Sequence, residues 1–166
     1  MRSKLLITNV GVAIALITAA CGGSTSTATA SPATSPAASP AANPPATGAT
    51  VAVATNAKLG QILVDDKGMT LYLFVADKGT ASTCYTSCAT IWPPLLTNGS
   101  PQAGTGADAS LLGTTMRTDG KVEVTYAGHP LYYFVQDKAA GDATGQGVNG
   151  FGGLWWVVTP SGAAMH

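Results

Sequence analysis

The chain has 166 residues, enough for one domain, and its 8 basic residues balance its 8 acidic residues. Charge this sparse gives no support to nucleic-acid binding, which needs clustered Lys and Arg against phosphates. Every Phe, Tyr and Trp lies between Tyr72 and Trp156, so residues 1–71 cannot supply an aromatic core.

The N-terminal segment has the pattern of a secretory leader. Arg2 and Lys4 precede a mostly apolar run over residues 5–20, which is shorter than the about 20 residues that a spanning helix needs. Residues 1–20 are therefore predicted to be a signal peptide. Thr18-Ala19-Ala20-Cys21 resembles a bacterial lipobox, in which small residues precede a cysteine that is lipidated and becomes the new N-terminus. The alternative is an ordinary cleavage site beside an incidental cysteine. On the lipobox interpretation, lipidated Cys21 holds the protein at a membrane.

Residues 22–50 contain only Gly, Ser, Thr, Ala, Pro and one Asn. Such a segment cannot bury enough apolar area to offset the entropy lost on ordering it. Residues 21–50 are therefore predicted to be a lipidated cysteine followed by a disordered tether. The tether would hold a folded domain, residues 51–166, outside the cytoplasmic membrane.

Within that domain, LYLFVAD (71–77) is nearly repeated as LYYFVQD (131–137). Both runs are short and apolar on both faces, which is typical of buried central strands. Their flanks also match: a turn glycine precedes each run (Gly68 and Gly128), and a Trp-led segment follows each (91–99 and 154–162). One such unit cannot cover its own apolar face, whereas two can cover each other. We expect an all-β domain of two pseudo-equivalent antiparallel units, about 51–99 and 111–162, packed as a sandwich or a barrel.

Six residues give these two runs the pattern Tyr-x-aromatic-x-x-Asp: Tyr72, Phe74, Asp77, Tyr132, Phe134 and Asp137. With the nearby segments CYTSCATIWPPL and GQGVNGFGGLWWV, the pattern resembles a bacterial family described as secreted lipoprotein repeats of unknown function. The resemblance covers about residues 58–160 in addition to the lipobox. It implies lipid anchoring and a repeat architecture, and it implies no activity.

The Tyr and Asp of one motif are five residues apart, so on a straight strand they point to opposite faces. We therefore expect each Tyr to fill the core with its hydroxyl hydrogen-bonded, and each Asp to close a turn by binding backbone N–H groups. Contact with a ligand is the alternative.

Cys84 and Cys88 follow the first motif. Outside the cytoplasm, two cysteines at this spacing favour a structural disulfide. The alternative is a copper-binding or redox site, because paired thiolates recur in copper sites together with His and Met. Met69 and His129, each just after a turn glycine, are the candidates to complete such a site. The main interpretation needs no cofactor.

The sequence has no nucleophile elbow, zincin motif, P-loop or calcium-loop pattern, and His129 and His166 are its only histidines. We therefore expect a non-enzymatic module in the cell envelope that binds a partner or a small ligand. The Trp residues and the glycine loop at 141–153 are the expected exposed binding face. A copper-binding or redox protein and a purely structural spacer are the alternatives.

Overall fold

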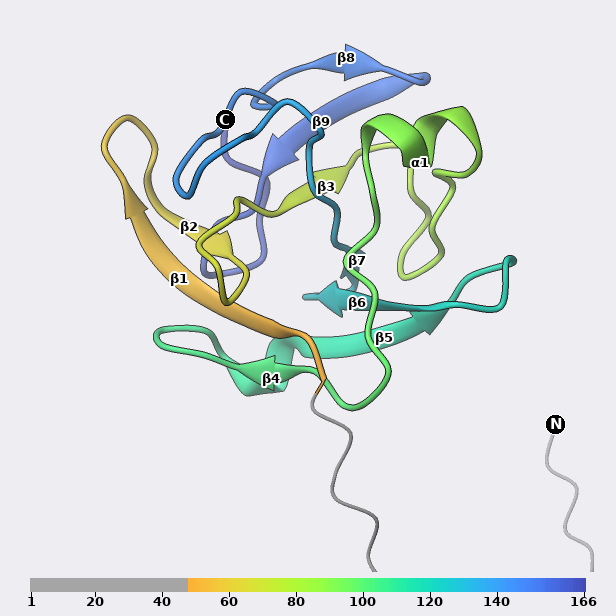
Figure 1. The fold of residues 1–166 in the computed structure, drawn as a ribbon, viewed down its shortest axis with the longest axis horizontal. Helices are drawn as coiled ribbons and strands as arrows, with labels where there is room; N and C mark the ends of the chain where they lie inside the picture. Colours follow the sequence, from red (N-terminus) through yellow and green to blue (C-terminus); the bar gives the residue numbers. More distant parts are fainter. Residues whose placement is uncertain (1–47) are drawn as a thin grey trace, which may run out of the picture. The chain divides into compact units, whose positions relative to one another are not determined.

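The computed structural model describes residues 48–166, so the predicted signal peptide, Cys21 and the tether up to residue 47 lie outside the described residues. The predicted all-β class is confirmed, because the described part of the chain is built mainly from strands (Figure 1). The strands are β1 (Thr50–Asn56), β2 (Gly60–Val64), β3 (Tyr72–Phe74), β4 (Gln102–Ala103), β5 (Leu112–Met116), β6 (Val122–Tyr126), β7 (His129–Pro130), β8 (Asn149–Gly150) and β9 (Gly153–Val157). They form three three-stranded sheets, ordered β2-β1-β4, β3-β9-β8 and β5-β6-β7.

Each repeat begins with an antiparallel hairpin, β1–β2 in the first and β5–β6 in the second. The N–H of Leu71 donates to Leu63 O and the N–H of Leu131 donates to Val124 O, each at 3.0 Å. Leu63 and Val124 are therefore equivalent positions in the two repeats. Their hairpin partners are Val53 and Thr114, which are equivalent for the same reason.

The two repeats meet at a pseudo-twofold axis between Tyr72 and Tyr132. These residues exchange both backbone hydrogen bonds, each 2.9 Å from N to O. Beyond this point the repeats also exchange their Trp-led segments. Strand β9 of repeat 2 pairs with β3 of repeat 1, and the two lie side by side in Figure 1. In return, Leu95 of repeat 1 bonds Leu131 and Val124 of repeat 2 at 2.8 Å each. Each repeat is thus completed by a segment of the other.

A column of four aromatic rings crosses the core at this axis. Phe74 stacks on Trp155 with 4.0 Å between ring centroids, Trp155 on Trp92 with 4.1 Å, and Trp92 on Phe134 with 4.2 Å. Trp92 and Trp155 are 1% and 0% exposed, so the expectation that the Trp residues form an exposed face is wrong for these two. Stacking with the motif phenylalanines buries both rings, while Phe151, at the tip of the β8–β9 turn, is 48% exposed.

The repeats differ in the connection that follows each motif. Repeat 1 forms a short helix, α1 (Ser87–Ile91), and its Trp-led segment makes only isolated β-bridges, whereas that of repeat 2 contributes strand β9. Pro93 and Pro94 lack the N–H groups that a ladder requires. A 3₁₀ turn, η1 (Ala109–Leu111), leads into β5.

Candidate functional site

The motif residues of the two repeats bond across the axis. Tyr72 OH donates to Asp137 Oδ2 at 2.6 Å, and Tyr132 OH donates to Asp77 Oδ2 at 2.7 Å. The other oxygen of each Asp closes a turn, as we expected of these carboxylates. Oδ1 of Asp77 accepts from the N–H and the hydroxyl of Thr83, and Oδ1 of Asp137 does so from the equivalent Thr144.

Both motif tyrosines are fully buried. Burial and then the hydrogen bond to Asp137 raise the pKa of the Tyr72 hydroxyl far above its ordinary value. Burial and then the charge of Glu123 do the same for the pKa of Tyr132. Each hydroxyl therefore stays protonated and acts as a donor to its Asp. These pairs join the repeats internally, and of their four residues only Asp77 is partly exposed.

A buried ion pair extends this network in repeat 2, and sequence reasoning missed it. Arg117 Nη1 lies 2.7 Å from Glu123 Oε2 and 2.8 Å from Ser82 Oγ, while Nη2 donates to Cys84 O at 2.8 Å. Ser82 Oγ is also 2.7 Å from the hydroxyl of Tyr132. Arg117 thus fastens the cysteine loop of repeat 1 to repeat 2. The available signal was composition, because Glu123 is the only glutamate in the chain and Arg117 the only arginine after Arg2.

Glu123 is the most perturbed carboxyl in this network. Its side chain is 0% exposed, and its Oε1 has no hydrogen-bond partner in the described residues. Burial raises the pKa of Glu123 to about 7, against the opposing effect of Arg117. A group closed off from solvent in this way cannot exchange protons directly with a bound substrate.

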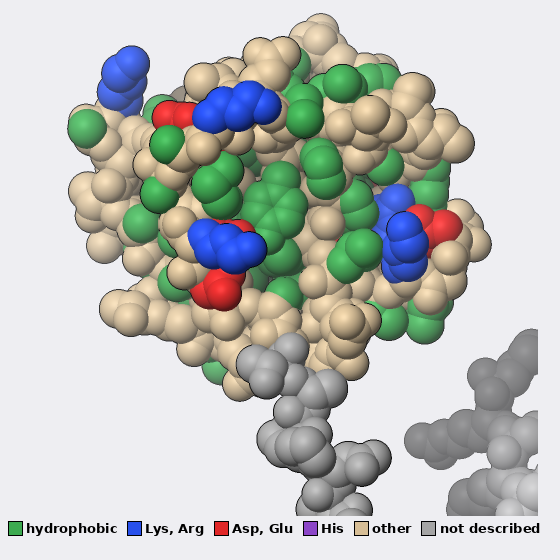
Figure 2. Space-filling view, viewed as in Figure 1, with side chains coloured by type: hydrophobic (Ala, Val, Ile, Leu, Met, Phe, Trp, Pro, Cys, Tyr) green, Lys and Arg blue, Asp and Glu red, His purple; other side chains and the backbone are tan. Residues whose placement is uncertain are grey.

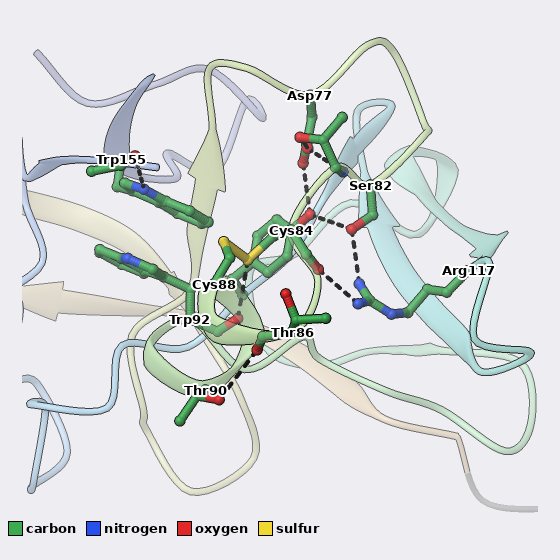
Figure 3. Close-up of a disulfide and its surroundings, with 12 residues drawn as sticks. Asp77, Ser82, Cys84, Thr86, Cys88, Thr90, Trp92, Arg117 and Trp155 are labelled. Carbon is green, nitrogen blue, oxygen red and sulfur yellow. Dashed lines mark hydrogen bonds between the residues drawn. A yellow bond between two sulfur atoms is a disulfide. The ribbon is translucent and has the colours of Figure 1, made fainter. Parts of the chain in front are cut away.

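Cys84 and Cys88 form a disulfide with 5.2 Å between their Cα atoms, beside Trp92 (Figure 3). Both sulfur atoms are thereby used within the chain. Met69 and His129 lie half-buried at the equivalent turns before Leu71 and Leu131. Across residues 48–166, no group of three or more His, Cys, Asp and Glu side chains is placed to hold a metal ion.

The accessible feature is a groove of about 910 Å³ beside β5. Its walls come from residues 96–101, Ala109, 112–114 and 120–122. These side chains are hydroxyl, amide and aliphatic groups with a single charge, that of Lys121, and they include no His, Cys, Asp or Glu. A surface of this kind can hydrogen-bond and pack against a ligand, but it lacks a nucleophile with a general base.

The glycine loop that we expected at the binding face borders a second hollow, of about 580 Å³, lined by residues 55–59, 141–144 and Gln146. Asp142 in this hollow already accepts the N–H groups of Lys138 and Ala139. Figure 2 shows basic and acidic side chains beside one another on the face that it presents, around a hollow with hydrophobic side chains.

A family of secreted repeats of unknown function matches residues 53–96 and 113–159. These two segments coincide with the two hairpin-led repeats of the structure. The chain belongs to this family. The resemblance to secreted repeats that the sequence motifs indicated is therefore confirmed. No curated protein and no solved structure matches it. In residues 48–166, none of the helices has the length and apolar character needed to cross a membrane.

Proposed function

We propose that this secreted-repeat protein is a lipid-anchored, non-enzymatic binding module of the cell envelope. In this proposal Cys21 carries the lipid, and the two-repeat domain is displayed outside the cytoplasmic membrane. The lipobox-like Thr18-Ala19-Ala20-Cys21 and the uncharged segment after it support the anchor. Membership in a family of secreted repeats supports the location.

The groove beside β5 is the observation that carries the binding role. The polar motif residues bond one another and, apart from the half-buried Asp77, are buried, so their hydrogen-bonding groups are already used within the chain. The groove instead exposes hydroxyl and amide groups beside aliphatic side chains, with no acid–base pair. A concave site of this composition orients a neutral polar ligand through a few hydrogen bonds.

Metabolic labelling of cells with an alkyne analogue of palmitate tests the anchor. The wild-type protein should carry the label and sediment with membranes, whereas Cys21→Ser should remain unlabelled and lose the membrane fraction. A labelled Cys21→Ser protein would contradict lipidation at this residue.

Photo-crosslinking in living cells tests the binding role. A benzophenone amino acid replaces exposed Thr114, which lines the groove, or exposed Lys78, which lines neither hollow. The groove position should give a discrete adduct that the Lys78 position does not give. Equal adducts at both positions, or none at the groove, would contradict the proposal.

The copper or redox alternative requires Cys84 and Cys88 as thiolates, whereas the structure joins them. Thiol counting with metal analysis on protein purified without reductant separates the two proposals. Two blocked thiols and no copper would contradict the alternative. Stoichiometric copper that is lost in Cys84→Ser would support it.

A further inference from the structure

The outer edge of β1 is covered by another segment of the chain. Residues 102–105 run parallel to β1, with Thr50 beside Gln102. The N–H of Gly104 donates to Val51 O at 2.7 Å, and the N–H of Val53 donates to Thr105 O at 2.8 Å. The outward C=O of Val51 and the outward N–H of Val53 are thereby bonded.

The equivalent edge of repeat 2, the outer edge of β5, has no such cover in the part of the chain that the structure describes. The N–H of Arg117 bonds Lys121 O and that of Ala127 bonds Leu111 O. Because antiparallel bonding alternates along a strand, the N–H groups of Thr114 and Met116 point away from β6. Strand β5 ends its sheet, and no described residue accepts from either group. The N–H of Thr114, the counterpart of Val53, is therefore left without an acceptor among the described residues.

This edge also lacks the features that protect exposed strands from pairing. Leu112–Met116 reads LGTTM and contains neither a charged residue nor a proline. Both kinds of residue normally block edge pairing. Thr114 and Met116 are exposed, and residues 112–114 form part of the groove wall. The open backbone groups thus adjoin the site of the proposed function.

We propose that the outer edge of β5 binds an extended segment of a partner protein as an added parallel strand, as the edge of β1 binds residues 102–105. This inference rests on the proposed function and specifies its ligand. Strand addition supplies affinity through main-chain hydrogen bonds and specificity through alternate side chains.

Residues 102–105, which cover the edge of β1, indicate the composition of the partner segment. A Cβ atom on Gly104 would lie 2.9 Å from Ala52 Cβ, and one on Gly106 would lie 3.0 Å from Val53 Cβ. Residues 102–105 therefore approach β1 too closely for a larger residue at Gly104, whereas Gly106 has φ 78° and lies in the turn that follows. In repeat 2 the counterpart of Ala52 is Gly113, which has no side chain, so this size limit does not carry over to the edge of β5. The uncharged character of residues 102–105 does, and the partner segment should therefore be uncharged.

A labelled synthetic peptide with the sequence of residues 100–106, SPQAGTG, tests this binding by fluorescence anisotropy on the full-length chain in detergent micelles. We expect saturable binding. Thr114→Pro removes the outward N–H together with the hydroxyl, whereas Thr114→Val removes only the hydroxyl, so Thr114→Pro should bind about tenfold more weakly than Thr114→Val. A peptide N-methylated at the glycine that corresponds to Gly104 should also bind about tenfold more weakly, without any change to the protein.

Equal binding by wild type and Thr114→Pro, or by the two peptides, overturns the inference. Sedimentation of the peptide-free chain tests for another occupant. If the chain dimerises, Thr114→Pro abolishes the dimer and no peptide binds, a second copy of the chain occupies the edge, which also overturns the inference. If groove adducts form in cells but the peptide does not bind, the strand ligand is rejected and the proposed binding function stands. If neither groove adducts nor peptide binding is found, the strand ligand and the binding function are both rejected.

Discussion

The hydroxyl of Tyr72 lies 2.6 Å from Asp137 Oδ2, so the first motif of this protein is completed by the second. The reciprocal pair, Tyr132 and Asp77, is 2.7 Å apart. The Tyr and Asp of a single motif do not bond each other; the pseudo-twofold axis brings each to its partner in the other motif. The motif therefore acts as two cross-links between the repeats.

Removing one cross-link should destabilise the whole domain. Tyr72→Phe leaves Asp137 Oδ2 without its buried donor, which should lower the free energy of unfolding by about 1–3 kcal/mol. Tyr132→Phe should act similarly. Tyr85→Phe removes a hydroxyl whose one bond, from the Thr118 N–H, is exposed to solvent, and it should cost less than about 0.5 kcal/mol. Urea unfolding measures all three, and a Tyr72→Phe effect no larger than that of Tyr85→Phe would contradict the cross-link.

The aromatic column predicts a large loss of stability for one residue of the β8–β9 hairpin and almost none for another. Trp155→Ala removes a ring stacked between Phe74 and Trp92 and should cost about 3–5 kcal/mol. Phe151→Ala, at an exposed turn, should change stability by about 0.5 kcal/mol or less. Thermal unfolding followed by circular dichroism separates them, and similar melting temperatures would refute the column as a core element.

The disulfide should stabilise the domain modestly, because it closes a very short loop. Replacing both Cys84 and Cys88 by Ala should lower the free energy of unfolding by about 2 kcal/mol on loop-closure arguments. Adding reductant to the wild type should have a similar effect, and the double variant should no longer respond to reductant. A reductant response that persists in the double variant would show that another reducible group contributes.

Within that loop, Thr86 has φ 49° and ψ −116°, a conformation that β-branched residues rarely adopt. Thr86→Gly should relieve this strain and raise the free energy of unfolding by about 1 kcal/mol, after the entropic cost of glycine. Thr90 offers a matched control in α1, where Thr90→Gly should lower stability by about 0.5 kcal/mol. Destabilisation of similar size by both changes would argue against strain at Thr86.

Glu123 should make stability depend on pH. Its pKa is raised from 4.5 to about 7 on folding, so between these values the folded state binds more protons than the unfolded state. This contribution is fully present below the unfolded pKa and is lost as pH rises through 7. The free energy of unfolding of wild type relative to Glu123→Gln should therefore fall by up to about 3 kcal/mol from about pH 4 to about pH 8.

Asp119 provides a control of opposite sign. Loss of surrounding water opposes the shift, but the Lys121 N–H and the Arg117 guanidinium lower the pKa of Asp119. The stability of wild type relative to Asp119→Asn should therefore rise with pH at low pH. If the two variants show slopes of the same sign, the proton on Glu123 is not the cause.

Several local features were predictable from the sequence because short-range pattern determines them. The near repeat of LYLFVAD and LYYFVQD predicted two equivalent β units, since a short run that is apolar on both faces must be covered on both. The spacing of Cys84 and Cys88 predicted a disulfide, because it brings the two sulfurs within reach. The helix at Ser87–Ile91 was not predictable in this way, since its apolar residues read equally well as strand.

Only the tertiary structure decided which residues meet across the repeats. The exchange of Trp-led segments placed Trp92 against Trp155 and left both buried, where the sequence suggested an exposed face. The same exchange paired Tyr72 with Asp137, 65 residues apart. The open edge of β5 likewise depends on what covers β1 and not β5. Local sequence determines which face of a strand is apolar, whereas the long-range pairing of strands determines what lies against that face.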